Sequence, residues 1–508
     1  MDSRTWGIFG VIIIYLLGMV AIGVYYMKKN SSAGDYYLGG RGLGPFVTAM
    51  SAEASDMSSW LLMGLPGVAY LTGVADAAWT AIGLAIGTYL NWLIVAKRLR
   101  RYTEISNNSI TIPGFFSNRY RDKSKLLVAI SAIFIVIFFI PYTASGFAAC
   151  GKLFSTLFHV PYAQAMVVSA IVIVAYTTLG GFSAASMTDL IQSIVMTGAL
   201  ICVVLFGIST VGGADVVMND AGELPGYLSL TQSYVDGAAA EYGTIKIASM
   251  LAWGLGYFGM PHVLLRFMAI RDENEVKISR RIASVWVVIS MGVAIFIGLM
   301  GHSMTENGII DTLTGADSEK LIIMVGTLMS KTGAVGVIIA GLIMSGILAC
   351  TMSTADSQLL AASSSVSEDL LKGVFHLNLN EKWSLVAARI TVVVISIMGV
   401  LMAIDPNSSV FGIVSFAWAG FGAVFGPVML LALFWKRSNR YGAMVSMLSG
   451  GTMIFVWKYL VRPMGGAWDI YELLPAFLVA ITLNVIVSLA TGAPEREIIE
   501  EFNKAVGK

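Results

Sequence analysis

Charged residues, cysteines and histidines are all scarce in this chain of 508 residues. Only 12% of the residues are charged, against roughly 25% in an ordinary soluble protein, whereas 56% are hydrophobic and the mean hydropathy is +0.77. A soluble chain of this length needs a hydrophilic surface over its cores, and this composition does not supply one. The low charge therefore excludes a water-soluble protein, and the surplus apolar surface must face lipid.

The other scarcities narrow the class further. Cys150, Cys202 and Cys350 lie in apolar runs without a spacing pattern, which argues against a disulfide framework and a zinc site. The 32 basic and 31 acidic residues nearly cancel, so no nucleic-acid surface is expected. Only His262 and His302 fall in expected spans, outside any hydrolase or metalloprotease motif, so an enzyme is not expected. The expected partners are the lipid bilayer and a small-molecule substrate, and no obligate protein partner is implied.

Long apolar runs predict an all-α polytopic membrane protein with about thirteen transmembrane helices. The first run is longer than the core of a cleavable signal and is expected to be retained. The expected spans are 6–27, 44–70, 74–96, 126–157, 162–181, 185–210, 246–269, 282–304, 333–367, 384–404, 408–435, 441–461 and 472–492. We expect the stretch 211–243 to be an external loop.

Basic residues are sorted to one side of these spans. The loop 97–125 is rich in them, with Lys97, Arg98, Arg100, Arg101, Arg119, Arg121, Lys123 and Lys125. When loops are assigned to alternate sides, about 25 of the 32 Lys and Arg residues fall on the side of this loop, which the positive-inside rule places in the cytoplasm. An odd number of spans then places the N-terminus outside and the C-terminus inside the cell membrane.

Two spans are interrupted by polar or small residues at their middles, at Ser51–Trp60 and at Trp253–Pro261. Irregular backbone at membrane depth survives only where protein encloses it or where it lines a site, and paired interruptions mark the central site of transporters. Each interrupted span begins a set of five, so the second set is expected to be inverted relative to the first. The expected division is 1–43, an extra helix and first cytoplasmic loop; 44–210, the first repeat; 211–245, an external loop; 246–435, the second repeat; and 436–508, two extra helices and a cytoplasmic tail.

Two carboxylates fall in the first interrupted span, where a charge costs about 3 kcal/mol unless it meets water, an ion or a partner. Asp56 is therefore a functional candidate, although it could instead cap the broken helix by accepting N–H bonds from Ser58 or Ser59. Glu53 could face a vestibule, pair with a base or be protonated.

The span 333–367 carries a run of oxygen-bearing side chains. Ser353 and Ser357 lie one turn apart, with Thr354 and Asp356 beside them. Hydroxyl, carbonyl and carboxylate oxygens suit a hard ion such as Na⁺, although hydrogen bonding between helices is the alternative for the hydroxyls. Asp189 could cap its own helix or lie with Ser357 on an ion exit path.

Aromatic residues surround the interrupted segments. Trp253, Tyr257 and Tyr142 could form a wall for a small organic solute, or could simply pack in the core. Arg266 is expected to extend toward the cytoplasmic interface. The charges left at depth or at helix ends are then all acidic, namely Glu53, Asp56, Asp189 and Asp356, which favours cation-coupled transport.

Four segments carry a family resemblance, at residues 38–45, 52–67, 253–268 and 352–354. They resemble the bacterial sodium/proline symporters of the sodium/solute symporter family, and the similarity extends along nearly the whole chain. The resemblance implies a LeuT-type five-plus-five inverted repeat with one extra N-terminal and two extra C-terminal helices. It also implies sodium-coupled import of L-proline by alternating access.

The resemblance further implies roles for individual residues. Na⁺, the coupling ion, would be held by the backbone carbonyls of Ala54, Met57 and Cys350 and by the hydroxyls of Ser353 and Thr354. Residues linked to sodium binding or release would be Asp56, Asp189, Asp356 and Ser357. The substrate pocket would involve Ser58, Ser59, Trp60, Tyr142, Trp253, Tyr257 and Pro261.

Three positions depart from the family pattern. The proline symporters usually have Gly where Glu53 and Ser59 stand, and Gln where Met260 stands. Ser59 would narrow the pocket and Met260 removes an amide, so another small amino acid or carboxylate is an alternative substrate. Glu53 is an extra coupling candidate for a proton or second cation. An ion channel is the alternative from a different class.

Overall fold

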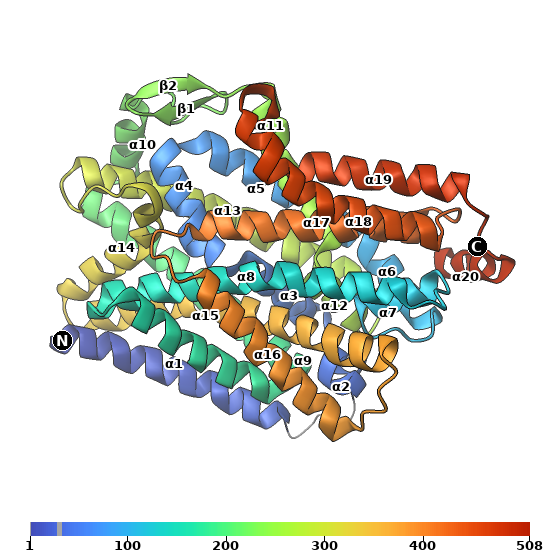
Figure 1. The fold of residues 1–508 in the computed structure, drawn as a ribbon. Helices are drawn as coiled ribbons and strands as arrows, with labels where there is room; N and C mark the ends of the chain where they lie inside the picture. The colour runs from blue at the N-terminus through green and yellow to red at the C-terminus, as the bar shows by residue number, and fades with distance from the viewer. Residues whose placement is uncertain (1, 28–32, 508) are drawn as a thin grey trace.

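The structure is a computed structural model that describes residues 2–27 and 33–507. Long helices that run roughly along one axis make up almost the whole molecule (Figure 1). The N-terminus and a small hairpin lie at one end, which we call the N-terminal end. The C-terminal helix lies at the opposite end with α6 and α7 (Figure 1). We call this second end the basic end, because residues 97–125 with their many arginines and lysines lie there.

The α-helices are α1 (Ser3–Met27), α2 (Ala33–Leu38), α3 (Pro45–Ser59), α4 (Leu65–Thr72), α5 (Val74–Leu90), α6 (Lys97–Ile105), α7 (Ile112–Arg119), α8 (Leu126–Phe158), α9 (Tyr162–Val211), α10 (Ala214–Glu223), α11 (Thr244–Leu251), α12 (Pro261–Ala269), α13 (Val276–Glu306), α14 (Leu321–Met329), α15 (Ala334–Ser364), α16 (Glu381–Met402), α17 (Val410–Phe434), α18 (Arg440–Val456), α19 (Leu473–Ala490) and α20 (Arg496–Val506). Tighter or wider helical turns are η1 (Gly39–Arg41), η2 (Trp60–Gly64), η3 (Asn91–Ala96), η4 (Ala252–Gly259), η5 (Gly315–Lys320), η6 (Ser330–Thr332), η7 (Ser365–Val374), η8 (Trp457–Val461), η9 (Arg462–Met464) and η10 (Gly466–Trp468). The strands β1 (Gln232–Val235) and β2 (Ala238–Glu241) pair antiparallel, with Gln232 opposite Glu241.

The all-helical membrane class is confirmed. Among the described residues, ten helices are long and apolar enough to cross a membrane. The other three expected spans are occupied by shorter pieces: α3–η2–α4, the first part of α9, and α11–η4–α12. The count of about thirteen stays a prediction. The expected external loop 211–243 contains α10 and the β1–β2 hairpin, and its place outside the membrane stays a prediction.

Both predicted helix interruptions are present. The first lies at Ser58, whose φ of 48° and ψ of −171° break the helix between α3 and η2. The second lies at Met260, whose extended backbone (φ −78°, ψ 105°) separates η4 from α12, and Pro261 begins the new helix. Proline at a first helical position costs no hydrogen bond, so Pro261 suits the restart. A positive φ at a serine is strained, and such strain persists only where the surroundings impose it.

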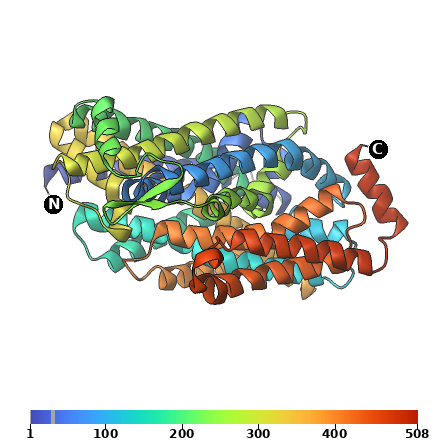
Figure 2. The ribbon, with the colours of Figure 1, turned by 90° about the horizontal axis from the view of Figure 1, so that it is seen from above.

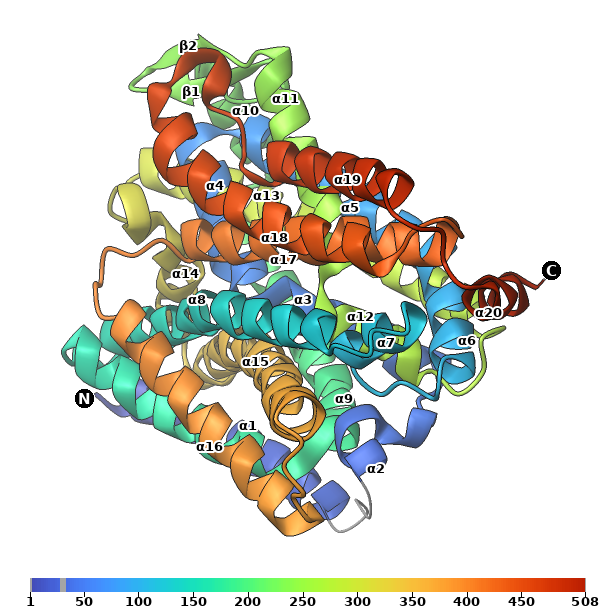
Figure 3. The same ribbon diagram turned by 45° about the vertical axis from the view of Figure 1, so that its right-hand side comes forward.

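Close backbone contacts hold the second broken helix against its neighbours. A Cβ on Gly87 of α5 would lie 2.3 Å from the carbonyl oxygen of Gly254 in η4, so only glycine lets these backbones meet. On the other side of the bundle, α17, α18 and α19 pack side by side (Figure 2). Figure 3 shows α3 and α12 in the interior, enclosed by longer helices that include α8 and α15. Both breaks are therefore buried in protein, as irregular backbone at membrane depth requires.

Candidate ion and substrate site

The first broken helix meets α15 through Ser353. Its Oγ lies 2.8 Å from the carbonyl oxygen of Ala54 and 3.2 Å from that of Cys350, and it can donate to either. The neighbouring Thr354 Oγ1 is buried and has no hydrogen-bond partner among the described residues. Three of the five predicted sodium ligands thus touch one another, and the fourth, Thr354, adjoins them with its acceptor capacity unused.

Met57, the fifth predicted ligand, lies directly before the break. Its carbonyl oxygen accepts the N–H of Trp60, so in this structure it closes the turn around Ser58. The described residues contain no group of three or more His, Cys, Asp or Glu side chains that could hold a metal ion. The oxygens gathered here are hydroxyls and carbonyls, the ligands that suit a hard monovalent cation rather than a soft metal.

Asp56 links the two broken helices. The Tyr257 hydroxyl of η4 donates to Asp56 Oδ2 at 2.5 Å, and the Tyr142 hydroxyl of α8 donates to the Asp56 carbonyl at 3.1 Å. Asp56 Oδ1 is buried and has no partner among the described residues. The alternative that Asp56 caps the broken helix by accepting the N–H of Ser58 or Ser59 is wrong, because Oδ1 accepts no hydrogen bond from the described residues and the observed donor to Oδ2 is the Tyr257 hydroxyl. One Asp56 carboxylate oxygen is therefore engaged by Tyr257, and the other has no hydrogen-bond partner among the described residues.

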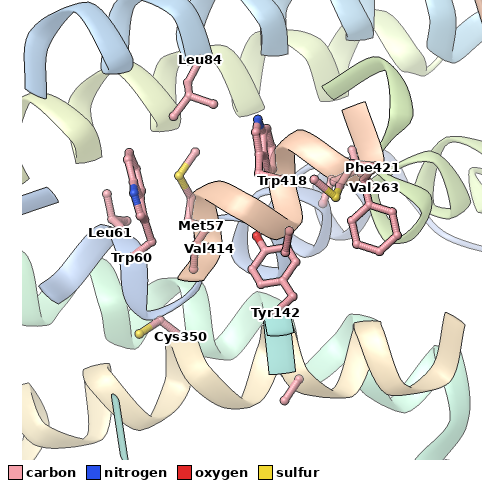
Figure 4. Packing of buried hydrophobic residues seen from close by; sticks show 14 of the residues in the cluster. Met57, Trp60, Leu61, Leu84, Tyr142, Val263, Cys350, Val414, Trp418 and Phe421 are labelled. Atoms are coloured by element: carbon pink, nitrogen blue, oxygen red, sulfur yellow. The ribbon is translucent and has the colours of Figure 1, made fainter. Parts of the chain in front are cut away.

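Aromatic rings cover the other side of the break. The Trp60 and Trp253 ring centroids lie 5.7 Å apart, and Phe411 of α17 lies 5.9 Å from Trp60 and 5.4 Å from Trp253. Trp418 Nε1 donates to the Trp253 carbonyl at 2.7 Å, which fixes the unwound segment against α17. In Figure 4, Met57, Trp60, Cys350, Tyr142 and Trp418 converge on one interior region from four parts of the chain.

The predicted substrate residues assemble around this region. Ser58, Ser59 and Trp60 follow one another at the first break, Trp253 and Tyr257 lie on η4, and Tyr142 faces Asp56 from α8. Ser59 Oγ is buried without a partner among the described residues. Pro261 begins α12 beside the buried His262, whose ring lies 6.1 Å from Tyr142. The sequence did not single out Phe411 or Trp418, because aromatic residues in a span are usually core packing.

Glu53 is buried one turn before Asp56. Its Oε1 accepts the Trp92 Nε1 hydrogen at 3.1 Å, whereas its Oε2 is unpartnered among the described residues. No ion pair with Glu53 is found in the described parts of the chain. Of the three alternatives for this residue, pairing with a base is therefore wrong. The other two alternatives, that Glu53 faces a vestibule or is protonated, stay predictions.

Arg266 does not extend to the interface, and that expectation is wrong. Its side chain is 1% exposed and forms an ion pair with Asp189 (Nη2–Oδ2 3.0 Å). It also donates to Ser51 Oγ at 3.0 Å, to the His262 carbonyl at 2.9 Å, and to Ser357 Oγ. Asp189 and Ser357 are brought together as predicted, but a guanidinium lies between them.

A second buried cation was also missed. Lys152 of α8 pairs with Glu319 of η5 at 2.5 Å, and both side chains are almost fully buried. Glu319 also accepts from Ser409 Oγ (2.9 Å) and from the N–H groups of Val410 and Phe411 (3.0 Å each) at the start of α17. The prediction that charges at depth are all acidic is thus wrong. The signal that could have found this pair was the charge of Lys152 within an otherwise apolar span.

Asp356 lies apart from the Ser353 contact. Its Oδ1 accepts a hydrogen bond from Thr177 Oγ1 of α9. This carboxylate therefore ties α15 to the first half of α9, on the helix that also carries Asp189. The observed hydrogen bond thus directs this carboxylate toward α9 and not toward the predicted sodium ligands.

Comparisons with known proteins identify the family of this chain. Residues 36–450 match the model of the sodium:solute symporter family. The chain is 43% identical to a sodium/proline symporter of Haemophilus influenzae (97% of this chain, 96% of the relative) and 42% identical to the high-affinity proline transporter PutP of Bacillus subtilis (96% and 98%). A substrate-bound outward-open sialic acid symporter coupled to Na⁺ has the same fold, with a TM-score of 0.79 at 18% identity over 96% of this chain and 99% of that one. This chain therefore belongs to the sodium:solute symporter family.

Proposed function

We propose that this protein imports L-proline together with Na⁺ by alternating access. As a member of a symporter family it is a transporter and not an enzyme, and symport replaces the channel alternative. Its relatives at 42–43% identity over nearly the full length are named as proline transporters, which supports proline as substrate. The observation that carries the coupling is the contact of Ser353 with the Ala54 carbonyl at the edge of a broken helix.

The proposed sodium site uses the oxygens around that contact. Ala54, Cys350, Ser353 and Thr354 would supply four of them, and Met57 would join when the turn at Ser58 opens. Asp56 would contribute its charge through the unpartnered Oδ1 while Tyr257 holds Oδ2. Na⁺ binding would then fix α3 against α15, and a ligand that stabilises one conformation shifts the population toward it.

The proposed proline site lies beside the ion. The carboxylate would rest at the start of η2–α4 near Ser58 and Ser59, where a helix N-terminus favours an anion. The apolar ring would lie against Trp253 and Tyr257. Ser59 and Met260 also fit another small amino acid or carboxylate, which stays the alternative substrate.

Release is proposed toward the basic end. The positive-inside rule places that end in the cytoplasm, with the N-terminus outside and the C-terminus inside. Asp189, Ser357 and Asp356 lie on this side of the Ser353 contact, and Arg266 occupies the space between the first two. Na⁺ would leave past Asp189 when the Arg266 contacts loosen. The membrane potential contributes about 2.3 kcal/mol per charge per 100 mV to the driving force.

Uptake into proteoliposomes tests the proposal. Purified full-length protein would be given a panel of labelled amino acids with and without an inward Na⁺ gradient, at several pH values. We expect saturable L-proline accumulation that requires Na⁺. Preference for another amino acid would replace the substrate, uptake driven by a pH gradient alone would replace the coupling ion, and non-saturable flux would contradict symport.

A further inference from the structure

A groove on the lipid-facing surface lies between α3, α9 and α13. It encloses about 560 Å³ and is lined mainly by apolar side chains, among them Phe46 and Met50 of α3, Ile201 of α9, and Val285 and Ile289 of α13. The polar groups in its wall are already engaged: the indole N–H of Trp286 donates to Thr197 at 2.9 Å, and Ser290 donates to the Val287 carbonyl at 3.2 Å. The groove therefore offers hydrocarbon contact along its length.

One end of the groove carries an unpaired cation. Arg281 lines this end, is exposed, and forms no hydrogen bond, ion pair or ring contact within residues 2–27 and 33–507. Lys277, one turn earlier on α13, is likewise exposed and has no partner among the described residues, but it does not line the groove. Arg280 lies over the Tyr89 ring and Arg271 pairs with Glu275. A free guanidinium at the mouth of an apolar groove is complementary to an anionic group attached to hydrocarbon.

The dimensions of the groove match one leaflet. Arg281 and Val293 bound it along α13, and the rise of twelve residue steps from one to the other corresponds to about 18 Å of helix. Half of a hydrocarbon core is about 15 Å thick. A molecule with its charged group at Arg281 and a chain lying along Val285 and Ile289 would reach roughly the middle of the bilayer.

We propose that this groove binds one anionic phospholipid of the leaflet at the basic end, with its phosphate on Arg281 and an acyl chain between α3, α9 and α13. Phe46 and Met50 place the chain against the same half-helix that carries Ala54 and Asp56. The bound lipid thus contacts the segment that ends at the first break.

Native mass spectrometry of the purified full-length protein tests this site. Phosphatidylglycerol and phosphatidylcholine with identical acyl chains would be titrated into wild type and variants. We expect wild type to bind one phosphatidylglycerol about fivefold more tightly than phosphatidylcholine, the effect of one basic residue at an anionic surface. Arg281→Gln should remove this preference, whereas Arg389→Gln, which changes an exposed arginine on α16, should keep it.

A second pair of variants tests the acyl chain. Ile289→Trp fills the groove and should weaken binding of both lipids, whereas Val288→Trp, at a similarly exposed neighbour outside the groove, should not. Equal affinity of wild type for the two lipids would overturn the proposal. So would equal behaviour of Arg281→Gln and Arg389→Gln, or of Ile289→Trp and Val288→Trp.

Discussion

Two buried ion pairs flank the site and differ in how completely their charges are satisfied. Toward the N-terminal end, both oxygens of Glu319 are used, by Lys152 and by three donors at the start of α17. Toward the basic end, Asp189 uses only Oδ2, which accepts from Ser51 and Arg266, and its Oδ1 has no partner among the described residues. Both pairs are buried, yet only in the first do both carboxylate oxygens have partners among the described residues.

The two ion pairs also join different elements around the site. The Lys152–Glu319 pair fixes η5 to the start of α17, and thereby fixes Phe411 over the Trp60 and Trp253 rings. The Arg266–Asp189 pair joins α12 to α9 and, through Ser51 and Ser357, to the two helices that carry the proposed sodium ligands. A sodium ion that leaves by this route needs an oxygen to bind. Asp189 Oδ1 can serve, because the Arg266 guanidinium engages only Oδ2.

Arg266→Met should give the largest effect. Removing the guanidinium leaves the Asp189 carboxylate buried with Ser51 as its remaining observed donor, and breaking a buried pair in this way costs about 3–5 kcal/mol. The unfolding midpoint of the purified protein measures the loss. The double variant Arg266→Met with Asp189→Asn should recover much of it, since no charge is then left unpaired. A single variant as stable as wild type would contradict the structural role of the pair.

Lys152→Met should cost less, about 2 kcal/mol, because Glu319 keeps its three donors at the start of α17. The same unfolding measurement applies, with Lys331→Met as the control because Lys331 is an exposed lysine at the same end. A loss as large as that of Arg266→Met would remove the distinction between the two ion pairs.

Ser353→Ala combined with Thr354→Ala should leave both ion pairs intact and act on the ion alone. We expect the Na⁺ concentration for half-maximal uptake to rise about thirtyfold, since each of the two lost oxygen contacts contributes about 1 kcal/mol. Ser345→Ala is the matched control, because that hydroxyl also lies on α15 and donates only to the Gly341 carbonyl. An unaltered sodium requirement would move the ion site away from α15.

Glu53→Gln should have the smallest effect at a single pH. Gln keeps an acceptor for the Trp92 indole, so uptake near neutral pH should stay within about twofold of wild type. If Glu53 takes up and releases a proton during transport, wild-type uptake will vary with pH and the variant will lose that variation. Identical pH profiles for the two proteins would exclude Glu53 as a coupling group.

Much of the fold could be predicted because membrane helices must satisfy their own backbone. Long apolar runs predicted the spans, and polar residues inside two of them predicted the breaks at Ser58 and Met260. Asp56 and the polar run around Ser353 were predicted in the same way, because a carboxylate or a cluster of hydroxyls at membrane depth is costly unless it has a partner or binds an ion.

Partners could not be predicted in the same way. Arg266 was expected at the interface because its position lies near a span end. The α12 segment is instead short and buried, and Arg266 pairs with Asp189, 77 residues away in the chain. The charge of Lys152 in an apolar span indicates that it needs a partner, but Glu319 lies 167 residues away in the chain, so no local pattern identifies that partner. The Trp92 contact of Glu53 likewise depends on how α3 packs beside η3.

The low charge of the sequence by itself determined a membrane protein, and the place of its few polar interruptions determined where the helices break. These properties follow from the chain's own hydropathy and from the cost of unsatisfied backbone in lipid. Only the tertiary structure decided which buried charges meet and which oxygens stay free. The reason is that a buried charge is neutralised by whatever lies nearest in space, and that neighbour comes from a different helix.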